Sequence, residues 1–157
     1  MLFKTINYRG GVLRFRIPSD WVEEYEDSGG GTFYEPGDDA GTLRVNVTTL
    51  EGPPGRNPTV DRLVEQFASA PEFFGATPVH LGEDAIIFRY DMPGEERGRT
   101  ITVHCWSILQ VVAPRNFRHV LFTYTLPPDT PACAAEMDVL DREIAAVQLS
   151  PRLGKVM

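Results

Sequence analysis

The sequence predicts an α+β fold: an antiparallel β-sheet of about six to seven strands with helices packed on it. Two observations predict this class. Segments in which apolar and polar residues alternate recur between Gly- and Pro-rich turns, a pattern typical of strands joined by short antiparallel connections. Two other segments carry apolar residues at helical spacing. The 157 residues form no repeat and contain no linker, so we expect one domain over residues 1–157.

The first third of the chain predicts an antiparallel meander. Residues 12–17 alternate and end at Pro18, which predicts a strand with one buried face. Residues 21–26 and 32–35 flank a Ser-Gly-Gly-Gly sequence and predict a hairpin. Another alternating strand follows over residues 43–48.

Two helices are predicted, each introduced by a capping residue and a proline. Asn57-Pro58 precedes the first, whose apolar positions fall at i, i+3, i+4 and i+7 over residues 60–67. Thr130-Pro131 precedes the second, whose apolar stripe runs almost to Ser150. The stripe consists of Cys133, Met137, Leu140, Ile144 and Val147.

Three longer strands are predicted between the helices, over residues 85–92, 100–112 and 117–126. Turns are expected at Pro93–Glu96 and at Pro114–Asn116. The middle strand is apolar on both faces, so we expect it to be central in the sheet and covered on both sides. Pairing Val112 with Phe117 across the last hairpin would place His119 opposite Gln110.

Charge and composition exclude several classes of function. The chain has 15 basic and 22 acidic residues and a net charge of −7, which disfavours binding to nucleic acid or to anionic membranes. No export signal and no apolar run of spanning length is visible, which predicts a soluble cytoplasmic protein. Cys105 and Cys133 are too few for a disulfide framework and are expected to be reduced and buried.

The order of elements, opening with Phe15-Arg16-Ile17-Pro18-Ser19-Asp20-Trp21, resembles the Mog/PsbP-like fold over roughly residues 12 to 149. This resemblance implies an α/β/α sandwich around an antiparallel sheet. It also implies a binding module, because the family includes photosystem extrinsic subunits, a Ran-GTPase-binding factor, and bacterial chaperones or immunity partners of secreted effectors. Fold alone does not specify which of these roles applies.

No catalytic, cofactor-binding or metal-binding motif is present. The three histidines, His80, His104 and His119, have no metal-ligand spacing and are interpreted as half-buried sheet residues. His104 and Cys105 are adjacent in a strand, so their side chains point to opposite faces and form no dyad. The Gly-rich turn lacks the lysine and the helix of a phosphate loop. We therefore expect no enzyme activity, no cofactor and no metal.

One set of residues on the long strands is a candidate partner-binding surface, because it mixes apolar and hydrogen-bonding side chains. Its principal members are Asn46, Arg89, Trp106, Gln110 and His119, accompanied by Ile108, Leu121 and Thr123. If a helix covers this face, most of these residues are ordinary core residues instead. Trp21 and Trp106 are interpreted as core anchors.

Two functions are compatible with these observations, and the acidic surface also permits a third, a structural subunit of a larger assembly. The first is a non-catalytic protein-binding module, such as a chaperone, adaptor or immunity partner of a bacterial secreted effector. The alternative is a small-molecule-binding protein or an enzyme whose site lies on the sheet face or the loops, which a pocket with polar groups around His104 or Gln110 would favour. Pairing of edge strands would also permit a homodimer.

Overall fold

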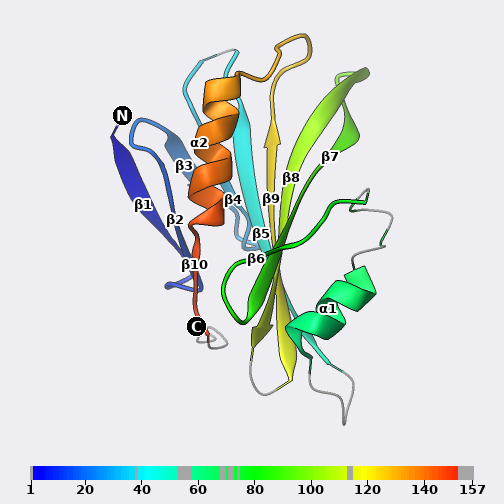
Figure 1. Ribbon diagram of the computed structural model, residues 1–157. Coiled ribbons are helices and arrows are strands. Elements are labelled where there is room, and N and C mark those ends of the chain that lie inside the picture. Colours follow the sequence, from blue (N-terminus) through cyan, green and yellow to red (C-terminus); the bar gives the residue numbers. More distant parts are fainter. Residues whose placement is uncertain are drawn as a thin grey trace.

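The computed structural model describes residues 2–37, 39–52, 58–67, 70, 73, 75–112 and 115–151. Two antiparallel sheets and two helices make up this part of the chain (Figure 1). The elements are β1 (Phe3–Tyr8), β2 (Leu13–Pro18), β3 (Val22–Tyr25), β4 (Gly31–Tyr34), β5 (Thr42–Glu51), α1 (Val60–Phe67), β6 (Val79–His80), β7 (Ala85–Glu96), β8 (Arg99–Val112), β9 (Asn116–Thr125), α2 (Ala134–Ala145) and β10 (Gln148–Leu149).

The large sheet has seven strands in the order β3-β4-β5-β9-β8-β7-β6, and every neighbouring pair is antiparallel. The α+β class and the antiparallel sheet are therefore confirmed. The 14-residue strand β8 lies inside the sheet and carries buried side chains on both faces, as its doubly apolar sequence predicts. Among the described residues, neither helix is long and apolar enough to cross a membrane.

The small sheet, β1-β2-β10, corrects the predicted meander. β2 pairs with β1 and with the short C-terminal strand β10, and it does not join the strands that follow it. The β3–β4 hairpin does form across the Gly-rich turn, and β4 continues the large sheet by pairing with β5. The predicted strands thus exist, but the first belongs to a separate layer.

The large sheet has an inner face, covered by the small sheet and α2, and an outer face, which carries α1 (Figure 1). Leu140 and Ile144 of α2 pack into the inner core together with Phe15, Trp106 and Phe122. Leu63 of α1 packs on the outer face against Ile86, Phe88 and Leu109. Trp21 and Trp106 are both buried, which confirms them as core anchors.

The helix starts differ from the predicted ones. At α1, the Arg62 amide donates to Oγ1 of Thr59 at 3.2 Å, whereas Asn57 lies outside the described residues. α2 begins with Cys133 as N-cap rather than with Thr130, whose amide closes a turn by donating to the Pro127 carbonyl. Cys133 is therefore exposed, in contrast to its predicted burial, while Cys105 is buried and unpaired as expected.

The β7–β8 hairpin is longer than predicted. Its turn consists of Arg97-Gly98, both with positive φ, as a two-residue hairpin loop requires, and not of residues 93–96. Pro93 is instead a strand residue opposite Thr102. The β7 edge beside it is not paired by β6, which bonds only at Ile86 and Ile87, so the missing proline N–H breaks no sheet hydrogen bond.

The β8–β9 register differs by one residue from the predicted pairing. Val112 pairs with Asn116 rather than with Phe117, and His119 pairs with Leu109 rather than with Gln110. A slip of one residue moves every side chain of a strand to the other face. The predicted β9 members of the candidate surface therefore lie on the opposite face from the one expected.

Candidate functional site

The predicted partner-binding surface is divided between the two faces of the sheet. The inner face carries four of its residues: Arg89, Trp106, Ile108 and Gln110. The outer face carries the other four: Asn46, His119, Leu121 and Thr123. Gln110 is buried and has a structural role: its amide N–H donates to the Ser150 carbonyl, and its oxygen accepts a hydrogen bond from Arg118. The prediction that these residues form one surface is wrong.

A groove of about 420 Å³ lies on the inner face, between the exposed end of β8 and the segment that leads from β9 to α2. Thr100, Ile101, Thr102 and His104 form one wall. Residues 126–132 form the other wall, which contains Leu126, three prolines, Asp129, Thr130 and Ala132. This size falls within the range of small-molecule sites.

His104 contributes an imidazole ring to this groove, and a residue of β7 orients the ring. Its Nδ1 lies 2.9 Å from Oδ1 of Asp91, the cross-strand partner of His104. A carboxylate only accepts hydrogen bonds, so Nδ1 carries the hydrogen in this contact, which is shorter than the 3.3 Å between Nδ1 and Nη2 of Arg89, a group that can only donate. The ring is thereby held in one tautomer, in the way that a carboxylate orients many functional histidines.

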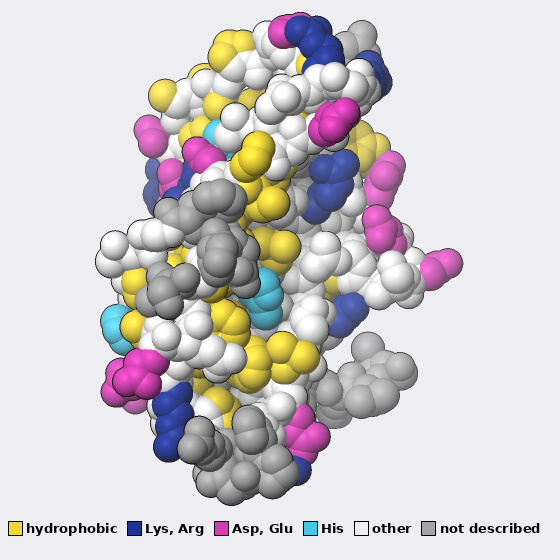
Figure 2. Space-filling view, turned by 90° about the vertical axis from the view of Figure 1, so that its right-hand side faces the viewer, with side chains coloured by type: hydrophobic (Ala, Val, Ile, Leu, Met, Phe, Trp, Pro, Cys, Tyr) yellow, Lys and Arg dark blue, Asp and Glu magenta, His cyan; other side chains and the backbone are white. Residues whose placement is uncertain are grey.

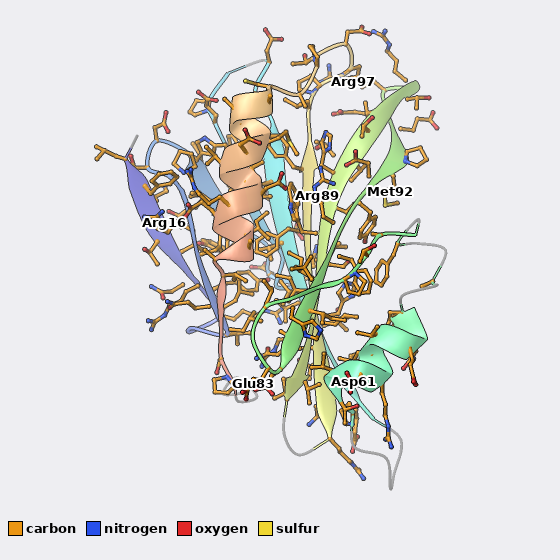
Figure 3. The ribbon with its side chains drawn as sticks, in the orientation of Figure 1. Arg16, Asp61, Glu83, Arg89, Met92 and Arg97 are labelled. Atoms are coloured by element: carbon orange, nitrogen blue, oxygen red, sulfur yellow. The ribbon has the colours of Figure 1, made fainter. Side chains whose placement is uncertain are left out.

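Arg89 fixes the position of Asp91. Its Nη1 donates to the same Asp91 oxygen at 2.6 Å, and its Nε donates to Asp141 of α2 at 3.3 Å. The guanidinium lies over the Trp106 ring, 4.7 Å from the centroid, and the Trp106 indole N–H donates to Asp141 at 2.9 Å. Figure 3 shows Arg89 beside α2, whereas Met92 of the same strand projects from the other side.

The electrostatics of the cluster keep Asp91 ionised. Partial burial alone would raise the pKa of the Asp91 carboxyl, but hydrogen bonds from Arg89 and His104 outweigh this effect and lower the pKa below its ordinary value. The carboxylate is consequently available at neutral pH to accept the hydrogen of Nδ1.

The second ring nitrogen of His104 faces the groove. The two nitrogens of an imidazole point in widely different directions, and Nδ1 is directed toward β7. Nε2 is therefore directed away from β7, and His104 is one of the residues that line the groove. Within the described part of the chain, Nε2 has no hydrogen-bond partner, and it is not among the buried unsatisfied atoms. It is accessible to a molecule in the groove.

The outer face contains a second polar cluster. Oγ of Ser107 lies 2.8 Å from the Tyr90 hydroxyl and 3.0 Å from Nε2 of His119. A serine beside a histidine base has the geometry of an activated nucleophile. Ser107 has no exposed surface, however, so it offers nothing to a substrate, and we interpret the cluster as a buried structural network. Figure 2 shows the side of the molecule that carries α1, where hydrophobic side chains gather on the surface.

The described ranges contain no group of three or more His, Cys, Asp or Glu side chains placed to hold a metal ion. His104 and His119 lie on opposite faces of the sheet, so they cannot share a ligand. His80 is exposed on β6, in contrast to its predicted half-buried position.

From the sequence alone, His104 is interpreted as a half-buried sheet residue and as one position where a pocket would favour a small-molecule site, whereas Asp91 is not singled out. One signal could have identified the pair. If Arg97-Gly98 is read as the two-residue turn, counting back along both strands places Asp91 directly opposite His104.

Comparison with known proteins supports the fold. No family model and no curated protein matches the sequence. A protein of Bacteroides thetaiotaomicron has a similar structure, with 21% identity and a TM-score of 0.60 over 96% of this chain and 49% of its own, so the chain spans about half the length of that protein. LpqN of Mycobacterium tuberculosis, described as involved in cell envelope biogenesis, gives 17% identity and a TM-score of 0.63 over 96% of this chain and 91% of its own. At these identities the likeness concerns the fold alone.

Proposed function

We propose that the protein is a binding protein that holds a small molecule in the groove beside His104. The observation that carries this proposal is the accessible Nε2 of a histidine whose other nitrogen is fixed by Asp91. A side chain that is oriented before binding loses little entropy when a ligand binds. The groove thus combines a preorganised polar group with apolar walls, as small-molecule sites do.

The residues give no reason to assign catalysis to the groove. Its described lining contains no cysteine or serine nucleophile, and the hydroxyls present belong to Thr100, Thr102 and Thr130. We therefore propose that the protein is not catalytic. We also propose that its fold is the α/β/α sandwich of the Mog/PsbP-like fold and that it acts in the cytoplasm. The cell envelope role described for LpqN belongs to that protein, and the shared fold transfers no residue role from it.

Small molecules enriched from a cell extract test this function. The wild-type protein, an Ala132→Trp variant and a Gln66→Trp variant would be dialysed against the same extract, and the retained compounds would be measured by mass spectrometry. Ala132 is an exposed lining residue, so an indole there would fill the groove, whereas Gln66 is exposed on α1. We expect a compound retained by the wild type and by Gln66→Trp but lost from Ala132→Trp. Equal retention by all three proteins would contradict the proposal.

A second candidate is the protein-binding module, a chaperone, adaptor or immunity partner of a secreted effector. It is favoured by the part of the outer face beyond α1, where polar and apolar side chains are exposed or partly exposed: Arg44, Asn46, Met92, Thr123 and Thr125. A partner that co-purifies with the wild type and is lost from Asn46→Arg would support this function. Gel filtration of the same samples would reveal a homodimer.

A further inference from the structure

The hydrogen-bond acceptor of the groove is defined by the Asp91–His104 contact. With the hydrogen on Nδ1, the neutral imidazole carries its lone pair on Nε2. A ligand that donates a hydrogen bond would complement this atom, whereas a ligand with acceptors only would leave it unsatisfied. An unsatisfied polar group in a desolvated contact costs more free energy than a hydrogen bond contributes.

The charges around the groove are already paired. Arg99 donates to Oδ1 of Asp129 at 2.6 Å, and Arg89 binds both Asp91 and Asp141. Two arginines thus face three carboxylates in the described surroundings, and each arginine is bound to at least one carboxylate. An anionic ligand would meet no unpaired cation, and a cationic ligand would compete with an arginine for every carboxylate.

The walls supply apolar contact and few donors. Pro127, Pro128 and Pro131 have no backbone N–H, and Leu126 contributes an apolar side chain. The threonine hydroxyls beside them both donate and accept hydrogen bonds. A molecule with one apolar side and one donating group would match this distribution.

From these three features we infer that the ligand is an uncharged molecule with an apolar body that donates a hydrogen bond, from a hydroxyl or an amide N–H, to Nε2 of His104. This inference rests on the proposed function, because it specifies the chemical class that the groove binds.

Four probes that share one ring and differ in one substituent test the inference. They are cyclohexylmethanol, cyclohexyl methyl ether, cyclohexylmethylamine and cyclohexanecarboxylate. Each would be titrated, at about pH 8.5, into protein labelled with ¹⁵N-histidine. The Nε2 resonance of His104, assigned by its loss in His104→Gln, reports binding, and His80→Gln is the matched control for loss of a histidine elsewhere.

We expect cyclohexylmethanol to shift the Nε2 resonance with a dissociation constant about fivefold or more below those of the other three probes, which corresponds to one net hydrogen bond. In His104→Phe the alcohol and the ether should bind equally. If the amine or the carboxylate binds as tightly as the alcohol at the same resonance, the groove binds ligands but the inferred class is wrong. If His104→Phe keeps the preference for the alcohol, Nε2 is not the acceptor. If no probe perturbs any groove residue, the proposed function fails as well.

Discussion

Nδ1 of His104 lies 2.9 Å from Oδ1 of Asp91, and the contact joins β8 to β7 beside an open groove. The Arg97-Gly98 turn brings the two residues opposite each other, because Asp91 lies six residues before Arg97 and His104 lies six residues after Gly98. A local feature of the hairpin thereby determines the hydrogen-bonding character of a site that lies well away from the turn.

Removing the Asp91 carboxylate should change the tautomer of His104. In Asp91→Ala, Nη2 of Arg89, 3.3 Å from Nδ1, becomes the remaining partner, and it can only donate. The hydrogen should then move to Nε2, which long-range ¹H–¹⁵N spectra detect directly. Folding stability should change by only about 0–1 kcal/mol, because the Asp91 side chain is half exposed. A spectrum that still shows hydrogen on Nδ1 would argue against the role assigned to Asp91.

The Arg16–Glu143 pair should contribute a pH-dependent part of the stability. Arg16 donates to both oxygens of Glu143, at 2.6 and 3.0 Å, and joins β2 to α2. This hydrogen bonding lowers the pKa of Glu143, despite the opposing effect of burial. Glu143→Gln should therefore lower the free energy of unfolding by about 1–3 kcal/mol at pH 7.

The sign of the pH dependence follows from the lowered pKa. The ionised Glu143 carboxylate makes its full contribution to the free energy of unfolding above the unfolded-state pKa of glutamate, about 4.3. This contribution is lost as the pH falls through the folded-state pKa. Urea unfolding at pH 7 and near pH 3 should show that the free energies of unfolding of the wild type and of Glu143→Gln become similar at the lower pH. Asp138→Asn, an exposed position on α2, should stay within about 0.5 kcal/mol of the wild type. A difference between wild type and Glu143→Gln that does not depend on pH would contradict this account.

The two cysteines should differ in reactivity. Cys133 is exposed at the start of α2, whereas burial raises the pKa of the Cys105 thiol to about 11. The thiolate is the reactive form, so a thiol reagent should modify one cysteine in the folded protein and both in denaturant. The Cys133→Ser variant should show almost no native-state labelling, as followed by intact-protein mass spectrometry. Rapid labelling of that variant would place Cys105 nearer to solvent than the structure does.

The outer-face network should stabilise the fold. Ser107→Ala removes the hydroxyl that contacts both Tyr90 and His119 in a buried position, and it should cost about 1–3 kcal/mol. Ser28→Ala, on the exposed β3–β4 turn, is the control and should change stability by less than about 0.5 kcal/mol. Chemical denaturation measures both variants. Equal stabilities would show that this network contributes nothing measurable.

Much of the fold could be predicted because it is encoded locally. Apolar patterns and turn residues identified β2, β3, β4, β5, β7, β8 and β9, and helical spacing identified α1 and α2, whereas β1 and β6 were not predicted. The strand β10 has only two residues, and its pairing with β2 depends on a contact between distant parts of the chain, so local patterns did not reveal it. For the same reason β2 was placed in the wrong sheet.

The site could not be predicted to the same extent, because it depends on register. Alternation shows which residues of one strand share a face, but it does not align that strand with its neighbour. The one-residue difference at Val112 put His119 on the wrong face, and the misplaced turn at Pro93 concealed the pairing of Asp91 with His104. The second wall of the groove comes from the connection before α2, which no local pattern relates to β8.

A crystal structure of the protein with the compound most enriched from cell extract tests the groove most directly. We expect density between β8 and residues 126–132, with a hydroxyl or amide nitrogen of the compound within about 3.2 Å of Nε2 of His104. A compound bound elsewhere, on the outer face for example, with the groove occupied only by water, would contradict this expectation.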